Sequence, residues 1–179
     1  IVPQIESAVA ATEAAGFRTM NVHLTGYREA FVHPKDAPGI VVQYIEKKTP
    51  QFTAPPDLPL PKTVAASFDY AAIAVRDLTR PLAFFVGLLG GHETARGTGD
   101  GTEWIELGWQ SPGRVRLLRP DSADSPVALR LGNRDSAIDH LALSMPDPST
   151  VEKAVALGDG RWEVIAADNW GLRLVISTC

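Results

Sequence analysis

One short pattern of residues occurs twice in this chain, and the two copies start 70 positions apart. Each copy begins with an aspartate and a ring side chain and continues with small and aliphatic residues, at 69–75 (DYAAIAV) and 139–145 (DHLALSM). The alternation within each copy is typical of a β-strand. A pattern that recurs at a fixed distance is the sequence sign of a repeated structural unit. We therefore predict two copies of one unit in the later part of the chain.

The residues after the first copy predict the rest of that unit. An apolar segment at 81–89 is followed by Gly90-Gly91, and glycine commonly ends a helix. Three short segments rich in β-branched and aromatic residues come next, separated by turns that contain glycine. These predicted strands lie at 93–96, 102–109 and 114–119. With an opening strand at 68–75, the predicted order is one strand, one helix and three strands.

The second copy predicts a shorter form of the same order. A polar and irregular stretch at 120–137 separates it from the first copy. The pattern then restarts with a strand at 138–145 and a helix at 148–157. Two further strands are predicted at 162–166 and 172–177.

The first part of the chain predicts a further unit without its opening strand. Apolar residues recur at helical spacing from Ile5 onward, and Gly16 stands where a helix would end. Three predicted strands follow at 19–24, 29–33 and 40–46. We expect a strand before Ile1 to complete this unit. Five prolines between 49 and 62 remove amide donors and favour an extended linker.

Together these elements predict an α+β fold, in which repeated βαβββ half-modules form curled mixed sheets flanked by helices. The 179 residues are enough to bury a sizeable core. We expect three parts along the chain: an incomplete first module at 1–48, a proline-rich linker at 49–66 and a complete pair of half-modules at 67–179.

Composition argues against several function classes. The chain is 45% hydrophobic and 21% charged, as ordinary globular proteins are. A net charge of −4 argues against a nucleic-acid partner. No apolar run approaches the roughly 20 residues that span a bilayer, so we expect no membrane partner. Cys179 is the only cysteine, which leaves no internal disulfide. We expect a protein of the cytoplasm.

Four motifs carry a resemblance to a known family. One motif runs from Asp69-Tyr70 to Gly90-Gly91, and others lie at 31–42, 116–128 and 168–174. They resemble the vicinal oxygen chelate superfamily, which includes glyoxalase I, methylmalonyl-CoA epimerase, extradiol dioxygenases and bleomycin-resistance proteins. The second and third motifs are similar to methylmalonyl-CoA epimerases in particular. The resemblance covers nearly the whole chain apart from the linker, and it implies a glyoxalase-like fold.

In metal-dependent members of this family, the first and last strands of two half-modules supply four ligands to one divalent ion. The resemblance places these positions at Tyr70, His140, Arg116 and Val175. Arg116 would bring a fixed positive charge to the ion, and Val175 has no lone pair. We therefore expect no metal in the complete module. In the first module Gln43 stands at a last-strand position, where a divalent metal would need further ligands from an upstream strand.

The candidate residues for binding a small-molecule ligand are His140, Arg116, Tyr70, Glu106 and Trp104. Strand alternation turns His140 toward the concave side of the sheet, although a histidine hydrogen-bonded inside the sheet is the other interpretation. Arg116 with Tyr70 suits a carboxylate or a phosphate. Alternatively, Arg116 pairs with Glu106 or Glu103 on the neighbouring strand.

Glu106 and Trp104 each have two interpretations as well. A desolvated Glu106 would be a general base for proton removal beside a carbonyl, and otherwise it lies on a solvated strand face. Trp104 packs in the core or at the mouth of the cup, and the alternative is an aromatic wall for a flat ligand.

Two functions of different classes are consistent with these residues. The first is an enzyme, most like an epimerase, a lyase or a dioxygenase, whose active cup lies partly or wholly in the first module. The second is a non-catalytic, metal-free binder of a small apolar or anionic molecule, of the resistance type. A third expectation is a homodimer, in which the incomplete first modules of two chains pair.

Overall fold

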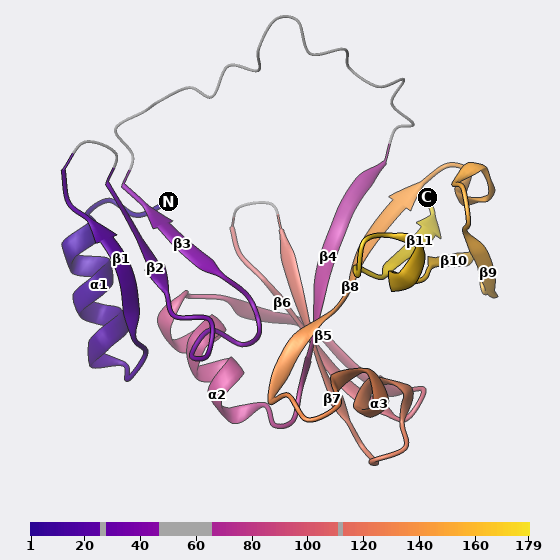
Figure 1. Ribbon diagram of the computed structural model, residues 1–179, viewed down its shortest axis with the longest axis horizontal. Coiled ribbons are helices and arrows are strands. Elements are labelled where there is room, and N and C mark those ends of the chain that lie inside the picture. Colours follow the sequence, from indigo (N-terminus) through magenta and orange to yellow (C-terminus); the bar gives the residue numbers. More distant parts are fainter. Residues whose placement is uncertain (26–27, 47–65, 111–112) are drawn as a thin grey trace, which may run out of the picture.

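The computed structural model describes residues 1–25, 28–46, 66–110 and 113–179 (Figure 1). Residues 49–65 of the predicted linker therefore lie outside the described residues. The described residues form one sheet of three strands and one of eight. No helix in these four ranges combines the length and the apolar character that crossing a membrane requires.

The larger sheet has the strand order β5-β6-β7-β4-β8-β11-β10-β9 (Figure 1). Its strands are β4 (Ser67–Val75), β5 (His92–Gly99), β6 (Thr102–Gly108), β7 (Arg114–Pro120), β8 (Ser136–Met145), β9 (Val155–Gly158), β10 (Arg161–Val164) and β11 (Leu174–Thr178). β4 is parallel to β7, β8 is parallel to β11, and the two first strands run antiparallel in the centre. Strands β8 to β11 thus repeat the order of β4 to β7, and the predicted α+β class is confirmed.

An extra residue in β8 decides which side chains face the interior of the curled sheet. Ile138 and His140 pair with the adjacent residues Ile73 and Ala72 of β4, so Asp139 is a β-bulge between them. A bulge interrupts the alternation of side chains along a strand. As a result Asp139 and His140 both line the same cavity, although they are neighbours in the sequence.

The other half of the sheet contains matching backbone features. In β4, Asp69 is the extra residue, because Phe68 and Tyr70 pair with adjacent residues of β8. The hairpins β5–β6 and β9–β10 both turn at an Asp-Gly pair with positive φ angles, at 100–101 and 159–160. A type I′ turn needs positive φ at both central residues and suits the twist of a hairpin. The two halves therefore share bulges and tight turns as well as strand order.

The helix after β4 starts slightly earlier than predicted. It consists of α2 (Thr79–Leu82) and a π-helical continuation, η1 (Ala83–Leu88). Phe84 and Phe85 on this helix are buried, and they pack with apolar residues of β4, β6 and β7.

The helix predicted at 148–157 does not form, and this prediction was wrong. Only η2 (Pro148–Thr150) is a short 3₁₀ turn, and β9 occupies the end of the predicted range. Lys153 has a φ of +64°, which lies outside the helical region. β9 also satisfies the backbone groups of β10 as its outer antiparallel partner, so pairing in the sheet outweighs the weak helical pattern.

A short helix occurs within 120–137, which was predicted to be irregular. This helix, α3 (Pro126–Leu131), starts where the Ser125 hydroxyl accepts a hydrogen bond of 3.2 Å from the Ala128 amide. A serine cap followed by proline is a common start of a helix. Apolar residues of α3 pack against β4, β7 and β8, and so α3 fills one end of the curled sheet. η3 (Ala166–Asp168) is a further 3₁₀ turn, between β10 and β11.

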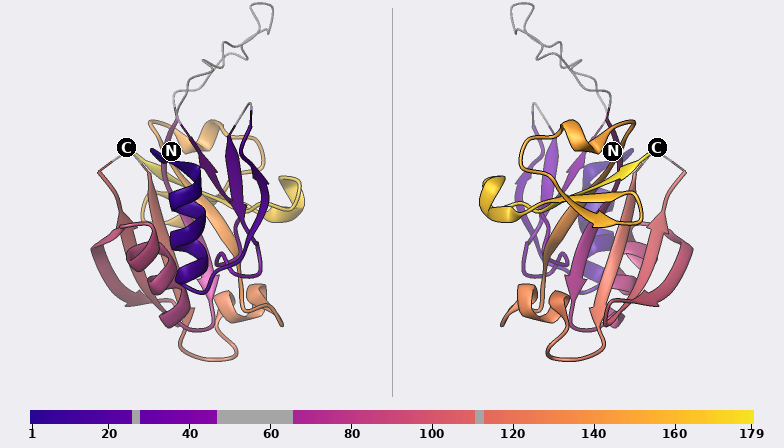
Figure 2. Two further views of the ribbon diagram at one scale, coloured as in Figure 1. Left: turned by 90° about the vertical axis from the view of Figure 1, so that its left-hand side faces the viewer. Right: turned by 90° about the vertical axis from the view of Figure 1, so that its right-hand side faces the viewer.

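The N-terminal residues form the three-stranded sheet and one helix. These elements are α1 (Ile5–Ala14), β1 (Thr19–His23), β2 (Glu29–Val32) and β3 (Val42–Ile45), with the antiparallel order β1-β2-β3. The Thr12 hydroxyl on α1 donates a buried hydrogen bond of 3.0 Å to the Tyr44 hydroxyl on β3. Beside β3, Val2 forms a parallel bridge with Glu46. These elements and strands β9–β11 lie on opposite sides of the molecule (Figures 1 and 2).

One apolar core joins the N-terminal elements to the larger sheet. Phe17, just after α1, packs edge-to-face on Phe84 with ring centroids 5.1 Å apart. The Arg80 guanidinium lies 4.8 Å from the centroid of the Phe17 ring and also pairs with Asp36. Burial of these aromatic rings, with the aliphatic residues of the same core, stabilises the contact between the two parts.

Gly39 is a second point of close approach between the two parts, and it generates a prediction. It has a φ of +70°, and a Cβ built on it would lie 2.7 Å from the Ala137 Cα of β8. Gly90 is a matched control, because its φ is +69° and nothing lies within 4 Å of such a Cβ. We expect Gly90→Ala to lower the free energy of unfolding by about 1 kcal/mol through backbone strain alone.

Gly39→Ala should lower the free energy of unfolding by about 1 to 3 kcal/mol more than Gly90→Ala does, because the methyl group also overpacks the contact with β8. Urea unfolding of both variants measures the difference. Equal losses in the two variants would contradict the close approach of residue 39 to β8.

Candidate functional site

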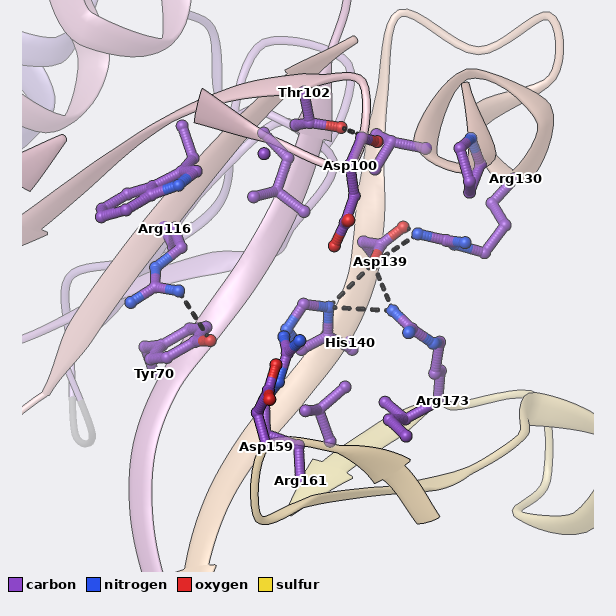
Figure 3. A pocket seen from close by; sticks show the side chains of 17 residues that line it. Tyr70, Asp100, Thr102, Arg116, Arg130, Asp139, His140, Asp159, Arg161 and Arg173 are labelled. Carbon is purple, nitrogen blue, oxygen red and sulfur yellow. Dashed lines mark hydrogen bonds and ion pairs between the residues drawn. The ribbon is translucent and has the colours of Figure 1, made fainter. Parts of the chain in front are cut away.

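The concave side of the larger sheet holds a cavity of about 840 Å³ that both halves of the sheet line (Figure 3). Five residues singled out from the sequence line this cavity, namely Tyr70, Trp104, Arg116, His140 and Val175. Glu106 is buried beneath them and reaches the cavity through Arg116. The four positions that the resemblance places around one ion, Tyr70, His140, Arg116 and Val175, therefore do line one hollow in the structure.

Arg116 lies between two aromatic rings in this cavity. Its guanidinium carbon is 3.9 Å from the centroid of the Tyr70 ring and 4.5 Å from that of the Trp104 ring. One terminal nitrogen donates a hydrogen bond of 2.9 Å to the Tyr70 hydroxyl. The buried Nε has no hydrogen-bond partner in the part of the chain that the structure describes. Contacts with both ring faces stabilise the cation and hold its position.

Arg116 also pairs with Glu106, which was one of the two interpretations of this arginine. Its second terminal nitrogen donates to Glu106 at 2.7 Å, whereas Glu103 pairs with Arg119. Arg114 donates to the other oxygen of Glu106 at 2.9 Å. Burial raises the pKa of Glu106. The hydrogen bonds and positive charges of Arg116 and Arg114 have the opposite effect and are stronger together, so the pKa of Glu106 is lowered. A carboxylate with a lowered pKa is a weak base, which disfavours Glu106 as the proton acceptor.

Asp139 is the centre of a second group of charges, on the opposite wall of the cavity (Figure 3). Its side chain is fully buried. It accepts hydrogen bonds from Arg130 at 2.8 Å, from His140 Nδ1 at 2.8 Å and from Arg173 at 3.0 Å. Burial would raise the pKa of Asp139, but the hydrogen bonds from His140 and Arg130 outweigh it and lower this pKa far below its usual range. Asp139 is therefore ionised at any ordinary pH.

His140 is neutral in this arrangement. Burial lowers its pKa, with smaller contributions from the charges of Arg173 and Arg130, and these effects exceed the opposing effect of Asp139. A neutral ring whose Nδ1–H donates to Asp139 has its lone pair on Nε2. Nε2 makes no hydrogen bond to any described residue, and the His140 side chain lines the cavity with 10% of its surface exposed. The histidine thus offers a free acceptor to whatever occupies the cavity.

Several lining residues were missed by the sequence reasoning, namely Arg130, Arg161, Arg173, Asp100, Asp139 and Asp159. Asp100 and Asp159 occupy the equivalent Asp-Gly turns, and the two Gly-Asp-Gly sequences at 99–101 and 158–160 were a signal that could have found them. Arg130 lies on the helix that was not predicted. Of the four tryptophans, Trp104 alone lines this cavity. Trp170, by contrast, is fully exposed in the turn before β11.

The side chains at the four positions where the resemblance places metal ligands do not form a set of metal ligands. The guanidinium of Arg116 occupies one position and is held there by Tyr70 and Glu106. Val175 provides no lone pair, and only His140 is a good ligand for a divalent ion. Among the described residues, no three His, Cys, Asp or Glu side chains come together as a metal ion would require.

Gln43 does not belong to this cavity, because it lies on β3 of the smaller sheet. Its side-chain amide donates a hydrogen bond to the Glu29 carboxylate on β2. A metal ligand role for Gln43 therefore stays a prediction that concerns the first module alone.

The fold is similar to that of several solved proteins. Methylmalonyl-CoA epimerase from Mycobacterium tuberculosis is 19% identical, with a TM-score of 0.55, over 68% of this chain and 93% of that one. The E43Q variant of the Streptomyces coelicolor epimerase, in complex with 2-nitronate-propionyl-CoA, is 19% identical, with a TM-score of 0.53, over 62% and 96% of the two chains. A hypothetical protein from Bacillus halodurans is also 19% identical, with a TM-score of 0.54, over 64% and 95%.

At this level of identity the likeness shows the fold, which is glyoxalase-like. No protein-family profile matches the chain. No curated protein matches its sequence. The Streptomyces coelicolor epimerase matches 62% of this chain, which is close to the fraction of the chain that lies between Ser67, where β4 begins, and Thr178, where β11 ends.

The group around Asp139 generates a prediction about stability. We expect Asp139→Ala to lower the free energy of unfolding by about 2 to 3 kcal/mol at pH 7, because the part-buried Arg173 and the buried His140 lose their hydrogen bonds to this charged carboxylate. Asp168→Ala is the control, since its pair with Lys153 is exposed and should be worth less than about 1 kcal/mol.

The same group predicts how stability depends on pH. The pKa of Asp139 in the folded protein is lower than its value of about 3.9 in the unfolded chain. The contribution of Asp139 to the free energy of unfolding is therefore complete above about pH 3.9, and it declines as the pH falls toward the pKa of the folded state. The difference between the wild type and Asp139→Ala should therefore shrink below about pH 4. Chemical unfolding at a series of pH values measures this, and a difference that grows in acid would contradict the assignment.

Proposed function

We propose that the cavity in the larger sheet binds a small organic molecule with an acidic group, without a metal ion. The observation that carries this proposal is the set of four arginines, Arg116, Arg130, Arg161 and Arg173, that lines one hollow of about 840 Å³. Cavities of this size are typical of sites for small molecules. Guanidinium groups suit carboxylates and phosphates, because their donors match the geometry of these anions.

Arg161 is the arginine best placed to hold the acidic group. Arg130 and Arg173 share Asp139, and Arg116 pairs with Glu106. Arg161 forms no ion pair with any residue that the structure describes, and its charge acts on the Tyr70 hydroxyl nearby. Asp100 and Asp159 also line the cavity, and they are exposed, as Arg161 is, so solvent screens the charges of all three.

A flat part of the same ligand would pack beside Trp104. The stack of Trp104, Arg116 and Tyr70 places two aromatic rings and a planar cation on one wall of the cavity. Such a wall favours rings and other planar groups. An acidic group at Arg161 and a planar group at Trp104 together define the ligand class.

Phenyl phosphate is a suitable probe, because it combines a ring with a strong anion. We expect it to bind the wild-type protein in the presence of EDTA and to bind Arg161→Gln about tenfold more weakly, through loss of one charge-assisted contact. Arg96→Gln is the matched control, because Arg96 pairs with Glu93 on the exposed strand β5. Isothermal titration calorimetry measures the affinities. Binding that needs an added divalent metal, or that Arg161→Gln leaves unchanged, would refute the proposal.

A second candidate function is epimerase-like proton transfer, and the geometry of His140 favours it. The neutral ring is held by Asp139 at 2.8 Å, and its free Nε2 lies at the cavity. The similar solved structures include epimerases of methylmalonyl-CoA. In this function Nε2 takes a proton from the carbon beside a carbonyl group. The electron pair of the C–H bond forms the C=C bond of an enolate, and the π electrons of the carbonyl group move to its oxygen. Return of a proton to that carbon restores the carbonyl group.

Tyr70 would support this step from the other first strand. Its ring and that of His140 have centroids 5.8 Å apart. Burial raises the pKa of Tyr70, more than the charge of Arg116 lowers it, so the phenol keeps its proton. Because its oxygen accepts from Arg116, its own hydrogen is available to the carbonyl oxygen that gains charge.

Exchange of the hydrogen beside the thioester of methylmalonyl-CoA in D₂O tests this candidate. We expect exchange without added metal, and a loss of at least about 100-fold in His140→Gln. Because the pKa of His140 is lowered, its neutral form persists below its ordinary pKa of about 6.5, and the rate should stay constant through that pH before it declines. Mass spectrometry follows the exchange, and an equal rate in His140→Gln would exclude this role.

A further inference from the structure

A second, smaller cavity lies next to the one described above. It has a volume of about 340 Å³ and is lined by the end of α3, the start of β8 and the connection from β10 to β11. Arg130, Asp139 and Arg173 line both cavities. The ion-paired group around Asp139 is therefore the wall between them, and the smaller cavity has surfaces of its own on the far side of that wall.

Three arginines and two carboxylates line the smaller cavity, which leaves an excess of one positive charge. Arg134 lies there, and its guanidinium donates to the carbonyl oxygens of Leu131 at 3.1 Å and of Arg130 at 2.6 Å. These contacts fix the side chain at the end of α3 and leave its charge without an ion pair among the described residues. Glu163, the second carboxylate of this lining after Asp139, is held by Arg173.

The remaining residues that line the smaller cavity are apolar. Ile138 and Ile165 both line it, and they are 43% and 47% exposed. Leu131 is buried at the same cavity, and Leu172 also lines it. Large aliphatic side chains that gather at a hollow with an excess of positive charge are typical of a ligand site and not of a plain polar surface.

We infer that this smaller cavity is a separate binding site for an amphiphilic organic anion, with a short aliphatic chain and one carboxylate. The carboxylate contacts Arg134, and the chain covers Ile138, Ile165 and Leu172. A volume of about 340 Å³ is near the lower end for small-molecule sites, which limits the ligand to a small size. This inference does not depend on the ligand of the larger cavity, because Arg134 and the two isoleucines line only the smaller one.

Hexanoate, hexan-1-ol and hexylamine are three probes with one chain and different charge. We expect hexanoate to bind most tightly and hexylamine to bind at least about tenfold more weakly. Amide chemical shifts in ¹H–¹⁵N spectra of the full chain should change near Ile138, Ile165 and Leu172 when hexanoate is added. The same titration gives the dissociation constant.

Substitutions separate charge from packing in this site. Arg134→Gln should weaken hexanoate binding about tenfold, Arg134→Lys should retain most of it, and Ile165→Asp should abolish it. Arg119→Gln is the matched control, since Arg119 pairs with Glu103 away from this cavity. Trp104→Ala, in the larger cavity, should leave hexanoate binding unchanged.

Two outcomes would overturn the inference. One is equal binding of hexanoate to the wild type and to Arg134→Gln, and the other is a set of shift changes centred on Tyr70 and Trp104. Phenyl phosphate titrated into the same samples distinguishes this failure from failure of the larger site, because its binding depends on Arg161 and not on Arg134.

Discussion

The antiparallel pairing of β4 with β8 joins the two halves of the larger sheet, and the positions of the candidate site residues follow from it. It sets Tyr70 opposite Ala142 and His140 opposite Ala72, so ring side chains from both first strands meet over small residues. The bulge at Asp139 then turns a carboxylate toward the same hollow. A regular strand would direct that carboxylate away from the hollow. The local irregularity of β8 is thus what brings an acid and a histidine together.

Burial of the Asp139 charge is the main electrostatic constraint on this region. A buried carboxylate is costly unless hydrogen bonds and opposite charges compensate it. Arg130 and Arg173 come from the helix before β8 and from the segment before β11, so compensation also ties these segments to the strand. The same contacts leave little freedom for the ring of His140. Stability and the orientation of a reactive side chain therefore depend on one group of contacts.

Much of this arrangement could be predicted from the sequence. The family resemblance places Tyr70, Arg116 and His140 around one hollow, and strand alternation predicts the same side for His140; all three line one cavity in the structure. The bulge at Asp139 could not be predicted, because it depends on the register with a partner strand. Arg161 was missed as a residue of the cavity lining, because the strand that pairs beside it was interpreted as part of a helix. Local propensity cannot show that an open sheet edge needs a partner.

The two halves of the sheet share a backbone plan, but equivalent positions carry unlike side chains. Tyr70 corresponds to His140, and Arg116 to Val175, by their places in the parallel strand pairs. Trp104 and Arg161 also correspond. Trp104 pairs with Leu118, two residues after Arg116, and Arg161 pairs with Ser177, two residues after Val175. A molecule in the hollow would thus contact aromatic rings, arginine side chains and the free imidazole nitrogen of His140, and these three groups have a chiral arrangement around the cavity. Three unlike contacts are enough to distinguish a chiral guest from its mirror image, so stereoselectivity follows from a symmetric frame with an asymmetric lining.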